Sequence, residues 1–452
     1  MLATVTWLQP RVGSFPEALA AFRAARLRSC LGLLNGLEST MAAILRARTL
    51  LRLGDPEAAR LTLEGRTSLE CPSRGEIAML RAVAHDRLGD RKISDDAFRD
   101  AFVYSVSALD FALEAEVDFF RGLASFRNGA LEEAQAACTR GLATAHSAKA
   151  GGSAGSSVPL GHVVSRLQEL LGIVATAQGR YRDSLVYART ALNTLDACST
   201  PDLYQHAFAL KNWAIVACEL DVVADTEAVA NRVSTFEWTD DVSRAQFAAL
   251  DVLGWSSALH GDIVGALRLF RRAGEIASTE PERIFIAVNR SIVARELGHK
   301  AMALEEVECA LRIADQYDWR KAPGDYRVAL LILAQAAATL TPARARQTLD
   351  RYTGTRDGID ALFAARFEPR LKAEEAFTEG LILRAEGRQP ASTERFRASF
   401  DIWQQIGFEW RAARAAVELA ELDGGEVFRL AVRREICTRP DSIFAERARL
   451  VA

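Results

Sequence analysis

The chain has 452 residues, of which 49% are hydrophobic and 25% are charged, so it can bury a large core but exceeds the usual length of one compact domain. Its formal net charge of −3 excludes a general electrostatic attraction to nucleic acid or to an anionic membrane surface. The seven cysteines form no close pair, and no basic segment followed by an apolar stretch begins the chain. We therefore expect a reduced, cytoplasmic protein without a membrane span.

Residues 1–38 are expected to form an incomplete N-terminal repeat. The segment SFPEALAAFRAARL, which follows Gly13, has the apolar spacing of a helix. Pro10 disfavours a helix before it, so the first helix of this unit is expected to be missing or stunted. Such a half-repeat would leave Leu19 and Phe22 exposed, which predicts self-association through this end of the chain.

Residues 39–146 contain the clearest copies of a helical hairpin. Apolar residues recur every three or four positions on both sides of Gly129, which can end a helix in the left-handed conformation. Gly122, Ala134 and Gly141 lie seven residues before, five after and twelve after this corner, where small side chains let two helix backbones approach closely. Small residues occur at all three offsets around Gly89, and at two of the three around Gly54, where Arg66 breaks the pattern.

The pattern continues beyond a Ser/Gly-rich segment at 147–158, which is expected to be a flexible loop. Over residues 159–407 we expect further corners at Gly179, Asp221, Gly261, Gly298, Thr341 and Gly387, of which those at 221 and 341 lack the glycine. A final amphipathic helix and two short helical segments are expected to cap the array over residues 408–452. Corners spaced near forty residues predict an all-α solenoid of stacked hairpins, with an irregular helical bundle as the alternative.

Two segments carry a resemblance to a known family. LLGIVATAQGRYRDSLVYARTAL and LGWSSALHGDIVGALRLFRRAGEIA resemble tetratricopeptide repeats, and the resemblance extends from about Gly13 to about Leu422. It implies a right-handed superhelical solenoid of tetratricopeptide-like hairpins, although the copies here are longer than the 34-residue form.

The long copies and the segment FDIWQQIGFEWRAARAAVELAEL are similar to the repeat arm of LuxR-type bacterial transcriptional regulators. Those regulators carry an ATPase module and a C-terminal helix-turn-helix. No GxxxxGK[ST] loop is present here, and the roughly thirty residues after Leu422 are too few for the usual DNA-binding domain.

The tetratricopeptide resemblance implies that the first helix of each hairpin lines a concave groove. Cationic residues there could bind a peptide carboxylate or an acidic side chain, aromatic residues could anchor apolar side chains, and asparagines could bind a peptide backbone. The cationic candidates are Arg48, Arg127 and Lys211, the aromatic candidates are Phe119 and Trp255, and the amide candidates are Asn212 and Asn289.

These features favour a non-catalytic scaffold that binds a protein or peptide partner. The six histidines form no H-x-x-x-H pattern and join no cysteine pair, so we expect no metal, no cofactor and no catalytic residue. Arginines without interleaved aromatic residues argue against a nucleic-acid partner. One alternative is the effector-sensing arm of a bacterial transcriptional regulator that lacks its own DNA-binding domain, and another is an enzyme that uses the array as a frame.

Overall fold

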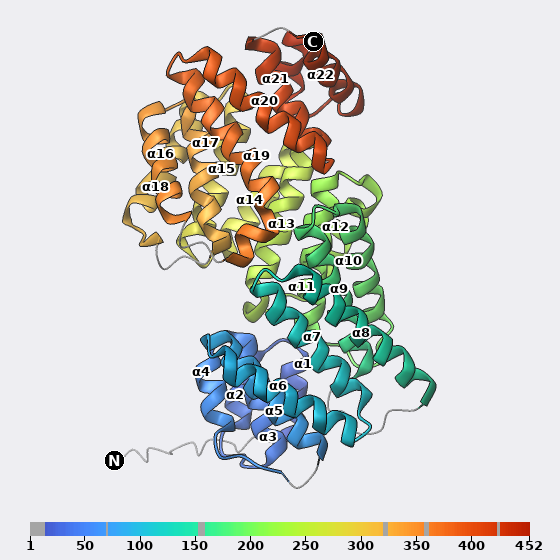
Figure 1. The fold of residues 1–452 in the computed structure, drawn as a ribbon. Coiled ribbons are helices and arrows are strands. Elements are labelled where there is room, and N and C mark those ends of the chain that lie inside the picture. The colour runs from blue at the N-terminus through green and yellow to red at the C-terminus, as the bar shows by residue number, and fades with distance from the viewer. Residues whose placement is uncertain (1–13, 69–70, 152–158, 320–323, 357–360, 423–424) are drawn as a thin grey trace, which may run out of the picture.

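The repeated unit of this protein is a pair of antiparallel helices joined by a tight corner. The computed structural model describes residues 14–68, 71–151, 159–319, 324–356, 361–422 and 425–452. These residues contain 23 α-helices and no strand. Helices that are neighbours in sequence pack against each other along the whole array (Figure 1). This arrangement confirms the predicted all-α solenoid of tetratricopeptide-like hairpins.

The helices follow one another with short connections. The N-terminal helices are α1 (Phe15–Arg23), α2 (Leu27–Leu34), α3 (Thr40–Leu53), α4 (Pro56–Leu63), α5 (Cys71–Leu88) and α6 (Arg91–Ser107). The central helices are α7 (Phe111–Arg127), α8 (Leu131–Gly151), α9 (Leu160–Ala177), α10 (Tyr181–Asp196), α11 (Leu203–Leu220), α12 (Val223–Thr235), α13 (Ser243–Leu259) and α14 (Ile263–Ile276). The remaining helices are α15 (Glu280–Glu296), α16 (Lys300–Gln316), α17 (Val328–Ala338), α18 (Pro342–Arg356), α19 (Ala361–Ala385), α20 (Gln389–Ile406), α21 (Glu409–Leu422), α22 (Glu426–Thr438) and α23 (Ala445–Val451).

The corners lie where the glycine pattern predicts them. Seven of the predicted corner glycines have φ between 75° and 85°, a left-handed conformation that strains any residue with a Cβ: Gly54, Gly89, Gly129, Gly179, Gly261, Gly298 and Gly387. Asp221 takes the same role with φ 53°. The corner near Thr341 turns without a left-handed residue, and Gly13 lies outside the described residues.

Small residues before and after each corner allow the two helices to touch. A Cβ added to Gly122 would lie 3.2 Å from the carbonyl oxygen of Ala134, and one added to Gly254 would lie 2.5 Å from the Phe270 ring. Phe270 and Ala134 are fully buried. The close approach of the helix backbones therefore requires these glycines.

The N-terminal end differs from the expectation of an exposed half-repeat. Helices α1 and α2 form a short pair that packs against α3. The Phe22 ring is only 8% exposed, because the Arg52 guanidinium lies 3.9 Å from its centroid, and Leu19 is half-buried. The prediction that these two side chains are exposed is wrong, which removes the physical reason for expecting self-association through them.

The Ser/Gly-rich segment and the C-terminal end were also predicted from the sequence. The segment predicted as a flexible loop, 147–158, begins as the end of α8, which runs to Gly151, and its remainder lies outside the described residues. After residue 408 the chain forms α21, α22 and α23, of which α22 packs on α21.

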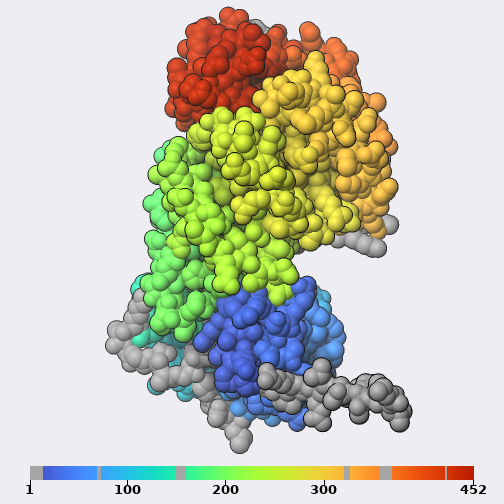
Figure 2. Space-filling view, turned by 180° about the vertical axis from the view of Figure 1, so that it is seen from behind, coloured from blue at the N-terminus to red at the C-terminus, as the bar shows by residue number. Residues whose placement is uncertain are grey.

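Contacts between segments far apart in sequence fold the array back on itself. Helix α19 touches α9 and α7, and the Tyr181 and Phe408 ring centroids are 4.4 Å apart. At the N-terminal end, the backbone N–H of Leu27 donates to Asp241 Oδ2 (2.6 Å). Figure 2 shows this region from behind, where the N-terminal helices meet the central part of the chain beside a notch.

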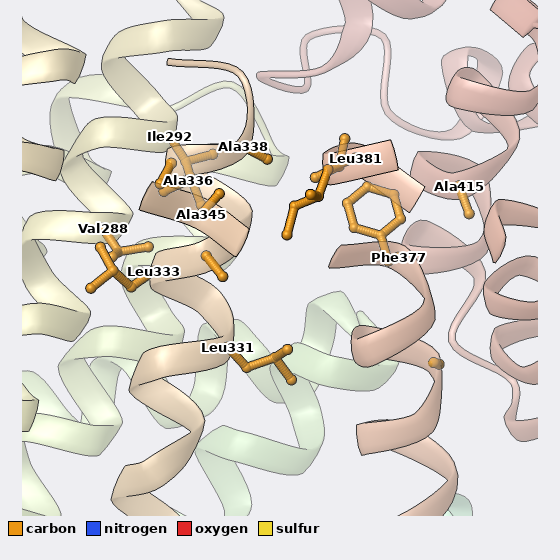
Figure 3. Packing of buried hydrophobic residues seen from close by; sticks show 14 of the residues in the cluster. Val288, Ile292, Leu331, Leu333, Ala336, Ala338, Ala345, Phe377, Leu381 and Ala415 are labelled. Carbon is orange, nitrogen blue, oxygen red and sulfur yellow. The ribbon is translucent and has the colours of Figure 1, made fainter. Parts of the chain in front are cut away.

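The largest apolar core runs through the C-terminal half. Its buried side chains come from both helices of successive hairpins, including Val288 of α15, Leu333 of α17, Ala345 of α18 and Phe377 of α19 (Figure 3). Further buried clusters lie within the N-terminal hairpins and between α7 and α9. A chain of cores in series is what a stack of amphipathic hairpins produces, because each hairpin buries its apolar faces on its neighbours.

Candidate ligand-binding pocket

All seven residues predicted to line a groove lie on the first helices of hairpins. Arg48 is on α3, Phe119 and Arg127 are on α7, Lys211 and Asn212 are on α11, Trp255 is on α13, and Asn289 is on α15. These helices also contact one another from hairpin to hairpin, as α7 does with α9 and α13 with α15.

Most of these seven side chains have partners within the chain. Arg48 pairs with Glu116 (2.7 Å) and Glu76 (3.6 Å), and Arg127 pairs with Asp86 (2.8 Å). Their guanidinium groups thus already bind carboxylates.

The two asparagines bind acidic side chains of neighbouring helices. Asn212 Nδ2 donates to Glu169 Oε1, and Asn289 Nδ2 donates to Asp251 Oδ1, both at 2.5 Å. Lys211 lies 5.0 Å from the Phe208 ring centroid, and Trp255 lies edge-on to Phe270 with the centroids 6.0 Å apart.

Among the seven, only Arg48 and Phe119 line the larger of the described cavities. This cavity, which we call the arginine pocket, has a volume of about 190 Å³ and lies between α1, α3, α5, α7, α9 and α11. Its lining contains five arginines: Arg23, Arg48, Arg52, Arg87 and Arg166. Apolar and aromatic side chains form the rest of its wall, including Leu51, Phe22, Phe119, Phe120 and Tyr204.

Three of the five arginines are held by carboxylates. Arg48 and Arg166 both bind Glu116 Oε1 at 2.7 Å. Burial would raise the pKa of Glu116, but the charges of Arg48 and Arg166 outweigh this and lower its pKa to about 2. Arg52 pairs with Asp202 at 2.5 Å, which joins α3 to the start of α11.

The other two arginines, Arg23 and Arg87, form no ion pair with any residue that the structure describes. Arg87 donates to the backbone carbonyl of Leu51. Burial and the nearby charge of Arg127 lower the pKa of Arg87 to about 10, so it stays protonated at neutral pH. His162, also on the wall, has a pKa lowered by burial. The pocket is therefore cationic.

A simple sequence signal could have identified two of the missed arginines. Arg52, Arg87 and Arg127 each lie two residues before a corner glycine, in three of the first four predicted hairpins. Of these three arginines, only Arg127 is among the groove residues predicted from the sequence, and the same spacing before Gly54 and Gly89 points to Arg52 and Arg87. Arg23 and Arg166 have no comparable signal, since α1 precedes the regular repeats and Arg166 lies near the middle of α9.

A smaller cavity of about 30 Å³ lies further along the array, where Glu169, Asn212, Glu219 and Arg370 contribute to its wall. Its volume holds about one water molecule. Within the described ranges, no group of three or more His, Cys, Asp or Glu side chains is arranged to bind a metal ion. The helices of the described chain include none that is both long and apolar enough to cross a bilayer.

No family model matches the sequence, and no curated protein matches it. Among solved structures, the crystal structure of the APC/C hetero-tetramer Cut9-Hcn1 is similar, with a TM-score of 0.31 and 13% sequence identity over 95% of this chain and 88% of that chain.

Proposed function

We propose that this protein is a non-catalytic helical-repeat scaffold that binds a protein or peptide partner and holds an acidic group of that partner in the arginine pocket. The supporting observation is the combination of unpaired cations and aromatic walls in one cavity. Arg23 and Arg87 lack carboxylate partners among the described residues, and Phe22, Phe119 and Tyr204 line the same space. Arginine recognises carboxylates with charge-assisted hydrogen bonds, while aromatic rings anchor apolar side chains.

The pocket accounts for part of the groove expected from the sequence. Arg48 and Phe119 remain proposed partner contacts because both line the cavity. Arg127, Lys211, Asn212, Trp255 and Asn289 lie outside it, and we propose that they position neighbouring helices rather than contact the partner directly.

Fluorescence polarisation with a library of short labelled peptides tests this function. Peptides with acidic side chains or a free C-terminal carboxylate should bind, and their amidated, neutral counterparts should bind at least tenfold more weakly, because about 1.4 kcal/mol of charge-assisted bonding is lost. The Arg23→Gln variant should weaken binding similarly, since this partly exposed side chain forms no ion pair with a described residue whose loss would disturb the fold.

The matched control is Arg99→Gln, on the exposed face of α6, where the side chain is 72% exposed and pairs with Asp96. It removes the same charge at a distance from the pocket, so peptide affinity should not change. Equal affinities for acidic and neutral peptides, or equal loss in both variants, would exclude the pocket as the partner site.

A second candidate is an effector-sensing arm, to which the similarity to LuxR-type regulators points. The arginine pocket favours it because the cavity lies between the N-terminal hairpins and the central helices, which the Arg52–Asp202 ion pair joins over 150 residues of sequence. A small anion bound there would contact both parts. Thermal stabilisation by small anions, together with no binding of any acidic or phosphorylated peptide, would support this candidate over a peptide scaffold.

A further inference from the structure

The charges around the arginine pocket do not balance. Five arginines line the cavity, and the carboxylates that pair with them are Glu76, Glu116 and Asp202. Among the next charged neighbours, Arg127 pairs with Asp86, and the charge of Lys211 only partly counters the burial that raises the pKa of Glu169 to about 7. Among the described residues, the arginines of the lining therefore outnumber their carboxylate partners by two.

Three arginines of the pocket lining have an unsatisfied donor atom. The Nε atoms of Arg48, Arg87 and Arg166 are buried and have no acceptor among the described residues. Gln205, on the same lining, has a buried Oε1 with no donor among those residues. These buried atoms partly offset one another, so it is the charge of the pocket that indicates the ligand class.

The rest of the wall is apolar and aromatic, so the ligand also needs an apolar surface. The Arg52 guanidinium lies 3.9 Å from the Phe22 ring centroid and 4.7 Å from that of Tyr204, and the Phe119 and Phe120 ring centroids lie 4.9 Å apart. Leu51, Leu80 and Leu123 complete the lining. Flat aromatic surfaces of this kind stack favourably on a planar apolar group.

We propose that the arginine pocket binds a doubly charged phosphoryl group carried on a flat apolar body. A phosphate monoester has close to two negative charges at neutral pH, which match the charge excess, and three strong acceptor oxygens that guanidinium groups can bind. A monocarboxylate supplies half the charge. This inference rests on the proposed function, since it names the acidic group that the same pocket holds.

The phosphoryl group has two chemical sources, a free small molecule or a phosphorylated aromatic side chain of a partner protein. The cavity volume of about 190 Å³ accommodates an end group rather than an extended peptide, so the same contacts serve both sources.

Isothermal titration of the full chain with phenyl phosphate, benzoate and inorganic phosphate tests the ligand class. Phenyl phosphate should bind at least tenfold more tightly than benzoate, which has the ring but one charge, and than inorganic phosphate, which has the charge but no ring. Its affinity should fall with added salt, because the contacts are between charges.

Two pocket variants and one control locate the binding. Arg23→Gln and Arg87→Gln should each weaken phenyl phosphate binding about tenfold or more, whereas Arg99→Gln should bind like the wild type. Because Arg87 also donates to the Leu51 carbonyl, circular dichroism melts show whether that variant is folded, and the Arg23 variant stands independently. The inference is overturned when phenyl phosphate binds no better than benzoate, or when both pocket variants bind it as the wild type does.

A phosphotyrosine peptide and its unphosphorylated counterpart separate this inference from the proposed function. Binding of phenyl phosphate without binding of any peptide would support the ligand class and reject the peptide scaffold. Tight binding of unphosphorylated acidic peptides, with none of phenyl phosphate, would reject the ligand class and leave the scaffold function standing. Preferential binding of the phosphorylated peptide supports both.

Discussion

At the residue scale, amide groups bind carboxylates between successive first helices. Asn212 donates to Glu169, Asn289 donates to Asp251, and Gln335 Nε2 donates to Glu374 Oε2 at 2.6 Å. Burial raises the pKa values of both Glu169 and Asp251 to about 7, and the amide hydrogen bonds offset only part of this effect. These side chains therefore fix the stacking of hairpins and make stability depend on pH.

The Asp251→Asn variant should remove part of that pH dependence. The unfolded chain releases the Asp251 proton near the ordinary pKa of 3.8, whereas the folded chain holds it until about pH 7. Folding stability is thus lost as the pH rises between these values, and it stays lower above them. Since the introduced asparagine does not titrate and its Oδ1 can still accept from Asn289, the variant should be more stable than wild type at pH 8 by about 1–2 kcal/mol.

Urea unfolding at pH 5 and pH 8 measures this difference, with the exposed Asp95→Asn as a control. The gain should be clearly larger at pH 8 than at pH 5. A gain of the same size at both values would mean that charge at Asp251 is not its cause.

At the element scale, a hairpin depends on its corner and on the close approach of its two helices. At seven corners a left-handed glycine ends the first helix, and small residues remove the side chains that would separate the pair. Where the partner atom belongs to a rigid, buried ring, as Phe270 does opposite Gly254, the packing has no room to adjust.

Gly254→Ala should therefore destabilise the protein, although alanine is the better helix former. The new Cβ would lie 2.5 Å from the Phe270 ring, and overpacking of this kind costs about 1–3 kcal/mol. Gly32→Ala, within α2, is the matched control because its Cβ would meet no atom within 4 Å, so it should stabilise by up to about 1 kcal/mol. Thermal or urea unfolding of the two variants should give opposite signs, and equal effects would contradict the close-approach argument.

At the scale of the whole molecule, ion pairs join parts of the array that are far apart in sequence. Arg411 of α21 donates to Glu219 of α11, 192 residues away, at 3.0 Å, and also binds Glu374 of α19. Near the C-terminus, Arg439 Nε donates to Asp221 Oδ2 at 2.6 Å, and the Ile443 N–H donates to the Ala258 carbonyl at 3.0 Å. These contacts close the superhelix that would otherwise be an open curved rod.

Arg411→Met should weaken this closure. The side chain of Arg411 is 13% exposed, and its loss leaves buried carboxylates with fewer partners, which costs roughly 3 kcal/mol or more. The control Arg434→Met removes an arginine that is 74% exposed and pairs with Glu409 at 3.4 Å, so it should change stability by less than about 1 kcal/mol. Unfolding measurements check the energies, and small-angle scattering should show a larger radius of gyration only for the Arg411 variant.

Local features of the sequence were sufficient for the fold. Gly129 and its equivalents specify left-handed corners through backbone sterics, and apolar spacing specifies which helix faces are buried. These effects act within one hairpin or between adjacent ones, so they can be predicted from the local sequence. The same local reasoning identified Arg48 and Phe119 among the pocket residues.

The pocket itself depended on tertiary structure. Arg23 of α1 and Asp202 beside α11 lie on one cavity although almost 180 residues separate them, and their meeting depends on small rotations that accumulate from hairpin to hairpin. Periodicity predicts that a residue faces inward, but not whether it meets solvent, a ligand or another turn of the same chain. The sequence by itself therefore determined the repeating unit and its corners. Only the tertiary structure decided which inward side chains neutralise one another and which pocket arginines lack a carboxylate among the described residues. The reason is that electrostatic pairing depends on distances between segments, which the repeat does not specify.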